Sequence, residues 1–355
     1  MGQYSDLPPE LIDEVLLLLD LPSLKSLSLT SSAFHTICFP RLFSSLRLSR
    51  LTPTFFADFK KRAPTPCVRT IRMEWLNKDL SNRLLPWCTE AHTVKIERGT
   101  TNNTMLLTTL TSLHYVKLSS LKFRTLASFF KLLSALPPSL KKLTLFEIKI
   151  HNSLWPSKYT TVSRGVELEH LETSNDMNLS LLIRDDCPIS LKSLRVACVQ
   201  YCYPQHLEVL IQKTPNLIDL RLEFRSPSER PVSLPLTRLK SLTIRFETRL
   251  ADEVERLFST HPDVPCTLED LTVILSWKDM CEPLAIALSH PKFRSLKSLN
   301  LDMTYYDYWV YGPCGLREFE EEAQKFQRRL EELGSEIDVR CIIRSVSEIV
   351  WLPFC

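Results

Sequence analysis

Glycine is scarce in this sequence. The chain has 355 residues and only 6 glycines, about 2%, against a usual level of about 7%. Glycine lets the backbone adopt left-handed conformations and approach a phosphate closely, so phosphate-binding loops use it freely. The six glycines stand too far apart to form a GxGxxG turn or a GxxxxGKS/T loop, and there is no GxSxG motif. The shortage argues against nucleotide-binding α/β enzymes and α/β-hydrolases, and it predicts a fold with little need for left-handed turns.

The sequence also lacks a segment that would direct it into or across a membrane. Residues 1–6 contain no basic region followed by an apolar run, and no apolar run approaches the roughly 18 residues of a membrane span. The net charge of +3 gives no sign of nucleic-acid binding. The 11 cysteines are scattered without close pairs, as expected of reduced thiols. We therefore expect an intracellular protein of the cytoplasm or nucleus, with neither membrane nor nucleic acid among its partners.

No arrangement of reactive side chains indicates catalysis. The 8 histidines form no Cys/His or Ser/His/Asp pattern. Cys198, Cys202 and His206 are spaced four residues apart and would align on one helix. However, Val196 is expected to end a strand, Pro204 interrupts the segment, and a fourth zinc ligand is missing. We expect no catalytic residue, no metal and no cofactor, and therefore a protein that is not an enzyme.

The first 45 residues form a separate helical unit. Asp6–Val15 begins a helix, because proline is tolerated in the first turn and acidic residues there suit the helix dipole. Seven of the nine residues of Leu11–Leu19 are apolar, which predicts burial on more than one side. Leu21-Pro22-Ser23 is expected to break this helix and cap a second one, and Ser31-Ser32 to lead into a third. Since so small a unit cannot bury this much leucine by itself, its surplus apolar face is expected to dock elsewhere.

Three motifs in this unit carry a family resemblance. They read Leu7-Pro8-x-Glu10-Leu11-Ile12-x-x-Val15-Leu16, then Leu21-Pro22-Ser23-Leu24-x-x-Leu27-Ser28-Leu29, then Ser32-Ala33-Phe34-His35-x-Ile37 followed by Pro40-Arg41-Leu42-Phe43. The segment resembles the F-box, a three-helix module that packs on a Skp-type adaptor and through it joins a cullin-RING ubiquitin ligase. The alternative is an ordinary helical cap for the rest of the chain. The resemblance implies adaptor contacts, direct or adjoining, by Leu7, Pro8, Glu10, Leu11, Ile12, Val15, Leu16, Leu24 and Leu27.

One position departs from the F-box pattern. Ser31-Ser32 stands where the family often has a Cys-Arg or Cys-Lys pair. Some polar contacts that F-box domains make at this pair are therefore expected to be weaker in this protein.

Leucine-type residues recur through the rest of the chain. The sequence contains 62 leucines, about one residue in six. Apolar residues recur at positions 1, 4 and 6 of ten short windows, with only Thr173 breaking the pattern. Alternation at positions 4 and 6 predicts a strand with one buried face, and helical spacing follows in residues 124–136, 204–213, 250–261 and 281–289. The windows begin at Val68, Ala91, Leu113, Leu140, Leu168, Leu191, Leu217, Leu239, Leu268 and Leu296.

The average interval between windows, about 25 residues, is typical of leucine-rich repeats. The segment resembles an irregular leucine-rich-repeat domain, as in F-box substrate receptors. The resemblance implies a curved solenoid of ten to eleven repeats, with a parallel inner sheet and outer helices. The Asn or Cys that the consensus places after the last leucine-type position is absent. Leu121, Ile148, Val199 and Arg225 stand at four such positions.

These patterns predict an α/β fold with three regions. Residues 1–45 form the F-box, and residues 46–65 form a linker helix built around Arg50–Ala63. Residues 66–355 form the repeat solenoid. It ends with an outer helix at 316–333, a last strand at 337–343 and an apolar C-terminal cap at 349–354.

Basic residues on the predicted strands are the first candidate for binding a target. Positions 3, 5 and 7 of each window point to the concave surface. At position 5, Arg72, Lys95 and Lys117 would stack about 5 Å apart across neighbouring strands. Such a column suits an acidic or phosphorylated segment, but Glu74 and Glu97 at position 7 offer the alternative that it is neutralised. Further along the chain, position 5 is occupied by Arg195 and Arg221.

An aromatic segment is the second candidate. The expected insertion Thr304–Pro313 follows the tenth window and is rich in the residue types that dominate binding hot spots. The alternative is that it folds down as a lid over the end of the solenoid. Its candidate binding residues are Tyr305, Tyr306, Tyr308 and Trp309.

Two functions remain open at this point. In the first, the protein is a non-catalytic receptor that docks a Skp-type adaptor and presents an unknown target protein for ubiquitination. In the second, it is a leucine-rich-repeat interaction scaffold without any association with a ubiquitin ligase.

Overall fold

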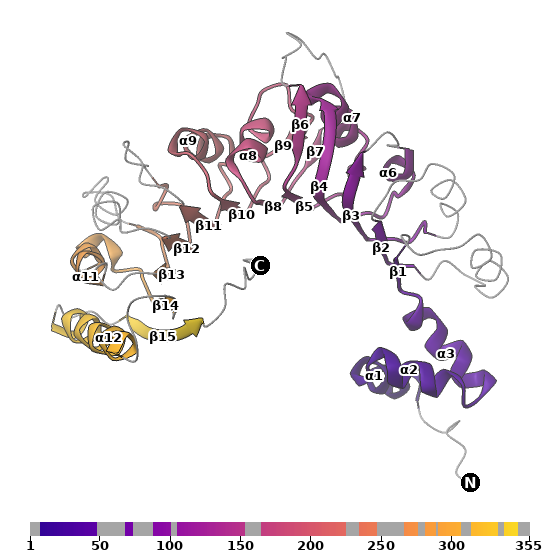
Figure 1. The fold of residues 1–355 in the computed structure, drawn as a ribbon, viewed down its shortest axis with the longest axis horizontal. Helices are drawn as coiled ribbons and strands as arrows, with labels where there is room; N and C mark the ends of the chain where they lie inside the picture. Colours follow the sequence, from indigo (N-terminus) through magenta and orange to yellow (C-terminus); the bar gives the residue numbers. More distant parts are fainter. Residues whose placement is uncertain are drawn as a thin grey trace. The chain divides into compact units, whose positions relative to one another are not determined.

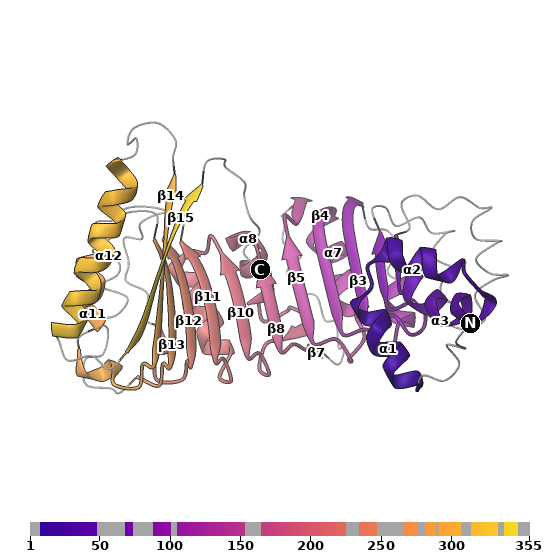
Figure 2. The same cartoon turned by 90° about the horizontal axis from the view of Figure 1, so that it is seen from below.

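The computed structural model describes residues 8–47, 68–73, 88–100, 105–152, 165–224, 234–246, 266–275, 281–288, 290–306, 314–332 and 337–346. The chain divides into two compact units. Unit 1 comprises Met1–Leu140 and Ile148–Ser157, and unit 2 comprises Lys141–Glu147 and Lys158–Cys355. Each unit contains parallel strands and helices (Figures 1 and 2). N-terminal helices followed by parallel strands and helices confirm the α/β class.

Unit 1 begins with three short helices and continues as a parallel sheet. Its strands lie in the order β1-β2-β3-β4, and β6 also pairs with β4. The helices are α1 (Pro9–Leu18), α2 (Leu21–Ser28), α3 (Ser32–Leu42), α6 (Met105–Thr109) and α7 (Leu126–Ser134). The strands are β1 (Ser45–Arg47), β2 (Thr70–Met73), β3 (Thr93–Thr100), β4 (Tyr115–Thr125) and β6 (Lys149–Asn152).

Short polar side chains cap the first turns of α2 and α3. The Asp20 side chain accepts a hydrogen bond of 2.9 Å from the Ser23 amide and so caps α2. The cap expected at residues 21–23 is therefore wrong, because Leu21 and Pro22 already lie in the first turn. Ser31 caps α3 by accepting from the Phe34 amide at 3.2 Å. These local bonds satisfy amide groups that a helix start leaves without a partner.

The passage from α3 to the sheet is short. Only Phe43 and Ser44 separate α3 from β1, and the Ser44 carbonyl accepts from the amides of Arg69 and Thr70 at 2.8 and 2.9 Å. Ser45–Arg47 therefore forms the first strand of the sheet, where a linker helix was expected to begin at residue 46. Residues 48–65 of that expected helix lie outside the described residues.

Unit 2 contains a longer parallel sheet and a separate two-stranded pair, β7 (Val166–Glu167) with β9 (Ile189–Ser190). The order of its main sheet is β5-β8-β10-β11-β12-β13-β14-β15. These strands are β5 (Lys142–Phe146), β8 (His170–Thr173), β10 (Val196–Gln200), β11 (Asp219–Phe224), β12 (Ser241–Phe246), β13 (Asp270–Leu275), β14 (Ser298–Tyr306) and β15 (Asp338–Val346). The helices are α8 (Asp176–Leu182), α9 (Pro204–Lys213), α11 (Cys281–Leu288), the 3-10 turn η5 (Pro291–Phe293) and α12 (Cys314–Glu332).

The alternation of the windows is confirmed in nine of the ten. In each of these, positions 4 and 6 lie on a strand and pair with their counterparts on neighbouring strands, as Ile71 does with Val94 and Leu271 with Leu299. No side chain at these positions is more than 2% exposed. Period-two burial on one face of each strand is therefore what holds the helices against the sheet.

The sixth window was placed three residues too early. Ala197 pairs with Leu171 and Val199 with Thr173, so the true window runs from Leu194 rather than from Leu191. Val196 accordingly begins β10 instead of ending a strand. The error arose because Leu191, Leu194 and Val196 match the apolar pattern by chance, and only the pairing with β8 distinguishes the two registers.

Four residues other than glycine take left-handed conformations, two of them within β3 and β4 and two directly after β5 and β10. Arg98, Ser120, Glu147 and Tyr201 have φ values between 51° and 61°. Each stands at position 8 of its window once the sixth window is corrected. The chain thus makes these turns with residues other than glycine, at a cost of about 1–2 kcal/mol each.

In unit 1, α6 and α7 lie on one face of the sheet, and in unit 2, α8, α9, α11 and α12 do (Figure 1). In unit 1 the Phe123 ring of β4 meets the Phe129 ring of α7 edge-on, with centroids 5.1 Å apart. In unit 2, α12 buries Ala323, Phe326 and Leu330 and contacts β14 and β15, so the helix expected at residues 316–333 lies on the outside of the sheet. The opposite face carries the residues at window positions 3, 5 and 7; we call it the open face.

Candidate functional site

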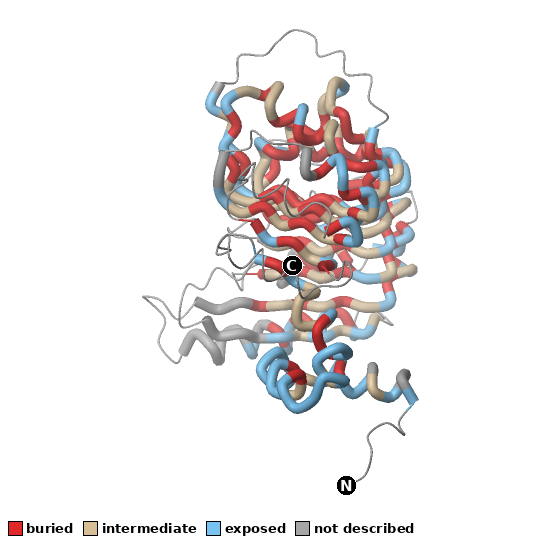
Figure 3. The backbone as a smooth tube through the Cα atoms, turned by 90° about the vertical axis from the view of Figure 1, so that its right-hand side faces the viewer, coloured by how far each residue is buried: buried red, intermediate tan, exposed pale blue. Residues whose placement is uncertain are grey.

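The N-terminal helices have a small core and a large apolar surface. Leu16, Leu24 and Cys38 are buried together, and Ile12, Leu19, Leu27 and Leu42 pack partly buried against them. Burial raises the pKa of the Cys38 thiol, so it stays neutral in this core. Most of the remaining surface of α1, α2 and α3 is exposed (Figure 3). Three short helices thus hold together around few side chains, which leaves much leucine outside the core.

An exposed apolar stripe runs along α1. Successive helix residues turn by about 100°, so Leu11, Val15 and Leu18 share one face, next to the face that enters the core. Their exposed fractions are 47%, 53% and 86%. Leu17 is 74% exposed and lies off this stripe, about 100° around α1 from Leu18. The stripe is a surface that a partner protein can cover, because exposed contiguous leucine side chains are unfavourable in water.

The residues expected to contact an adaptor divide between surface and core. Pro8, Leu11 and Val15 are exposed. By contrast, Leu16 and Leu24 are core residues, and Ile12 and Leu27 pack against that core, so these four act as supports rather than as a contact surface. The backbone of Glu10 lies in α1, and Leu7 lies outside the described residues.

Several exposed apolar residues were absent from the expected set. For Leu17 and Leu18 the signal was present in the sequence, because α1 is apolar nearly all round and only one of its faces can enter the core. They are Leu17, Leu18, Leu21, Leu29 and Ile37.

The Asp20 carboxylate stabilises the start of α2. Hydrogen bonds from Ser23 hold the pKa of the Asp20 carboxyl below its usual value, so Asp20 is ionised at neutral pH. An ionised carboxylate at the start of α2 also suits the positive end of the helix dipole. The turn between α1 and α2 is thereby fixed beside the apolar stripe.

The basic column expected on the sheet exists in unit 1. Arg72 pairs in register with Lys95, and Lys95 with Lys117. Arg47 on β1 pairs with Arg72 and extends the column by one strand. Sequence reasoning missed Arg47 because it placed residue 47 in a helix. Glu97 lies two residues along β3 from Lys95, while Glu74 lies outside the described residues.

In unit 2 the predicted binding residues do not form such a column. Arg195 is not at position 5 but just before β10, because the sixth window is shifted; Cys198 occupies position 5 there and pairs with Glu172. Arg221 does occupy position 5, and its guanidinium lies 3.5 Å from the Asp219 carboxylate. The two predicted arginines are therefore not part of one cationic surface.

The aromatic segment is only partly described. Tyr305 and Tyr306 belong to β14 and pair with Ser345 and Val346 of β15, so the strand extends into the expected insertion. Tyr308 and Trp309 lie outside the described residues.

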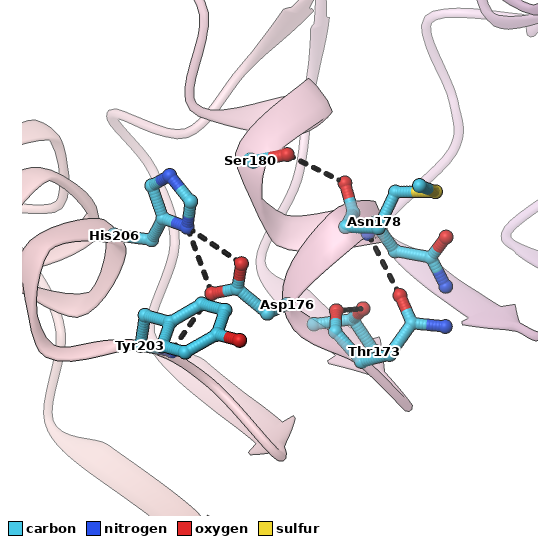
Figure 4. Close-up of polar contacts among 8 residues, drawn as sticks. Thr173, Asp176, Asn178, Ser180, Tyr203 and His206 are labelled. Atoms are coloured by element: carbon cyan, nitrogen blue, oxygen red, sulfur yellow. Dashed lines mark hydrogen bonds and ion pairs between the residues drawn. The ribbon is translucent and has the colours of Figure 1, made fainter. Parts of the chain in front are cut away.

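Asp176 joins two neighbouring helices of unit 2 (Figure 4). It lies in the first turn of α8, and its carboxylate accepts from His206 Nδ1 and from the Tyr203 amide, each at 2.8 Å. Tyr203 is the N-cap of α9 and makes no side-chain cap of its own. Asp176 therefore performs the capping of α9 from the preceding helix.

The three residues considered as zinc ligands do not lie on one helix. Cys198 is on β10, Cys202 follows that strand, and His206 is in α9 with Nδ1 bonded to Asp176. Burial, followed by the nearby Asp176 carboxylate, raises the pKa of the Cys202 thiol to about 12. Over the described ranges, no group of three or more His, Cys, Asp or Glu side chains is placed to hold a metal ion. Within the same ranges, no helix has the length and apolar character to cross a membrane.

Comparison with known proteins identifies the domain formed by the three N-terminal helices. The family model of the F-box domain matches residues 4–41, which include α1, α2 and nearly all of α3. No curated protein matches the chain. F-box domains typically bind Skp-type adaptors, and the exposed stripe on α1 lies within the matched segment. The N-terminal helices of this chain are therefore an F-box domain.

Proposed function

We propose that this protein is a non-catalytic, intracellular substrate receptor of a Skp–cullin–F-box ubiquitin ligase. Its F-box docks a Skp-type adaptor through the apolar stripe of α1, and its sheet region holds a target protein for ubiquitin transfer by other subunits. The observation that carries the proposal is the stripe of Leu11, Val15 and Leu18, exposed on a domain that the F-box model matches. Covering this stripe with a partner removes apolar surface from water.

We infer further that the sheet region is an irregular leucine-rich-repeat solenoid. Support comes from the corrected sixth window: counting from Leu194, Cys202 stands at the place where the repeat consensus has Asn or Cys. Cys202 is buried there. Parallel strands in sequence order, with positions 4 and 6 buried in every window once the sixth is corrected, support the same interpretation.

The short junction between α3 and β1 supports a receptor role. The Ser44 carbonyl bonds to two amides at the start of β2, and the Ser44 hydroxyl donates to the Arg41 carbonyl at 2.8 Å. The F-box and the first strands of the sheet are thus joined by hydrogen bonds rather than by a long linker. A target held on β1 would therefore lie only a few residues along the chain from the F-box.

The test is co-expression of the full chain with a Skp-type adaptor, followed by affinity capture. We expect Leu18→Asp to weaken capture by roughly tenfold or more, because burying an unpaired carboxylate in an interface is costly. Leu17→Asp is the matched control: it makes the same change on the same helix, at similar exposure, but off the stripe. Circular dichroism of both variants checks that α1 is intact.

The scaffold function without a ligase predicts a different outcome. A wild-type chain that is soluble alone and does not capture the adaptor would contradict the receptor proposal. Equal capture by wild type and Leu18→Asp would contradict the assignment of the stripe.

A further inference from the structure

The strands of unit 1 carry charge of nearly one sign. Strands β1, β2, β3, β4 and β6 contain a single acidic residue, Glu97. A sheet of this composition attracts anions to its open face and repels cations from it. The basic residues on the same strands are Arg47, Arg72, Lys95, Arg98, Lys117, Lys122, Arg124 and Lys149.

Four of these residues form a ladder across neighbouring strands. Arg47 pairs with Arg72, Arg72 with Lys95, and Lys95 with Lys117, each in direct register. Parallel strands are about 4.8 Å apart, so the three steps span about 14 Å. We call Arg47, Arg72, Lys95 and Lys117 the cationic ladder.

The ladder lies on the open face. On β2, Ile71 and Met73 are buried while Arg72 between them is exposed. On β4, Val116 and Leu118 flank Lys117 and are buried. A left-handed residue then shifts the alternation by one, so Lys122 and Arg124 are exposed on either side of buried Phe123, whose ring contacts α7.

A second group of cations lies beyond the left-handed residues Ser120 and Glu147. Lys122 pairs in register with Lys149 of β6, and both are exposed.

A row of hydroxyl groups runs beside the ladder. Two residues before each rung stands a residue that carries a hydroxyl, and these also pair in register from strand to strand. Hydroxyls donate hydrogen bonds to carboxylate and phosphate oxygens, and arginine adds a fork of donors to the same oxygens. The row consists of Ser45, Thr70, Thr93 and Tyr115.

Unit 2 provides an internal contrast. On its open face, carboxylates alternate with cations closely enough to pair: Arg221 with Asp219, Arg245 with Glu223, and Arg340 with Asp338, at 3.3 to 3.7 Å. In unit 1 the residues paired in register with each rung are cations, and Glu97, two residues from Lys95, is the single acidic residue of the described strands. An anionic ligand gains more on the open face of unit 1 than on that of unit 2.

We propose that the cationic ladder binds an extended protein segment carrying closely spaced oxyanions, either carboxylates or phosphates. This inference rests on the proposed receptor function, because it names the chemistry of the bound target. About five extended residues cover the 14 Å of the ladder. Anionic side chains of such a segment meet successive rungs, while its other oxygens accept from the hydroxyl row.

The experiment measures fluorescence anisotropy of labelled peptides with the full chain bound to its adaptor, or with the full chain alone if no adaptor is captured. The probes are a peptide of alternating Glu and Gly, a peptide with phosphoserine at the Glu positions, and a neutral peptide with Gln there. A single-stranded oligonucleotide of equal charge is the fourth probe. We expect the two acidic peptides to bind, the neutral one not to bind, and binding to fall as salt rises. The stronger of the two acidic peptides identifies the source of the oxyanion.

The ladder variant is Arg72→Glu with Lys117→Glu. It should weaken binding of the acidic peptides by roughly tenfold or more, because two of four attractions become repulsions. The matched control is Arg221→Glu, which reverses a charge at the same window position in unit 2 and should leave binding unchanged. If the double reversal does not fold, Arg72→Gln with Lys117→Gln removes the same charges without adding new ones.

Each outcome decides the inference separately from the receptor function. Equal loss in the ladder and control variants, no binding of either acidic peptide, or tighter binding of the oligonucleotide would overturn the ladder as a site for a protein segment. Adaptor capture is scored on the same samples. Peptide binding without adaptor capture would refute the receptor function and support the ladder as a binding site. Adaptor capture without peptide binding would support the receptor function and refute the ladder as a binding site.

Discussion

The open faces of the two units have the same backbone pattern but different arrangements of charge. In unit 1, parallel strands place Arg47, Arg72, Lys95 and Lys117 side by side. In unit 2, parallel strands place Glu223 beside Arg245, which pair at 3.7 Å. Oppositely charged neighbours in a sheet attract each other, whereas a row of like charges repels itself, and this repulsion is relieved when an anion binds. The difference separates a surface suited to a charged ligand from one that is already satisfied.

The largest expected change in stability comes from breaking the pair of Glu223 and Arg245 in unit 2. Glu223 is only 3% exposed although it lies on the open face. We expect Glu223→Ala to lower the free energy of unfolding of unit 2 by about 3–5 kcal/mol, because Arg245 is left without this carboxylate in a largely buried site. Urea unfolding followed by circular dichroism measures the loss. Replacing both residues by Met should restore most of it, and a double variant as unstable as Glu223→Ala would show that the charge pairing is not the cause.

The next effect concerns how helices begin in the two units. In unit 1, α7 is capped locally, because Thr125 and Ser128 bond reciprocally in a capping box. In unit 2, α9 takes its cap from Asp176 of the preceding helix. We expect Asp176→Ala to cost about 1–2 kcal/mol, since it removes this cap and the partner of His206.

The matched variant for this comparison is Thr125→Ala, with an expected cost of about 1 kcal/mol. Hydrogen exchange distinguishes the two. Protection should fall in both α8 and α9 for Asp176→Ala, but in α7 alone for Thr125→Ala. Loss confined to α9 would contradict the coupling between the two helices.

Removing one arginine charge should change the free energy of unfolding in opposite directions in the two units, by a smaller amount. Arg72→Gln removes a charge between two cations in register, so it should raise the free energy of unfolding by about 0.5 kcal/mol in low salt. Arg221→Gln removes the partner of Asp219 and should lower it by up to about 0.5 kcal/mol. Thermal melts in low and high salt check this. Equal signs, or a gain that persists in high salt, would argue against repulsion within the ladder.

The smallest effect is a dependence on pH that belongs to unit 2. The Lys297 ammonium bonds to the Glu269 carboxylate at 2.5 Å and lowers the pKa of that carboxyl below its usual value of 4.5. The carboxyl binds a proton more weakly in the folded state. Its contribution to stability is therefore present above the usual pKa and is lost as pH falls through the lowered one. Melting temperatures of wild type and Glu269→Gln should converge over that range, and a constant difference would refute the linkage.

Local patterns made much of the fold predictable. Pro204–Lys213 was expected as a helix and is α9 with the same bounds, since proline can begin a helix and the apolar residues recur every three or four positions. Alternation of buried and exposed residues likewise located β11, β12 and β13. The F-box segment was recognisable because its motifs are contiguous in the chain.

Long-range pairing decided what could not be predicted. The sixth window has two registers that fit the apolar pattern, and only the pairing of Ala197 with Leu171 distinguishes them. Arg47 looked like part of a linker until β1 was seen to pair with β2. On α1, the sequence could not say which leucines enter the core, because that depends on how α2 and α3 pack against it.

The scarcity of glycine also separates what neighbours in the chain determine from what long-range pairing determines. By itself, the sequence determined that phosphate-binding loops are absent, because such loops need glycine at fixed spacing. It also determined the F-box segment and the period of the strands, since both depend on neighbours in the chain. Only the tertiary structure decided that Arg98, Ser120, Glu147 and Tyr201 take left-handed conformations, and that four cations meet in one row. Those features depend on how distant strands pair, and no local preference specifies that pairing.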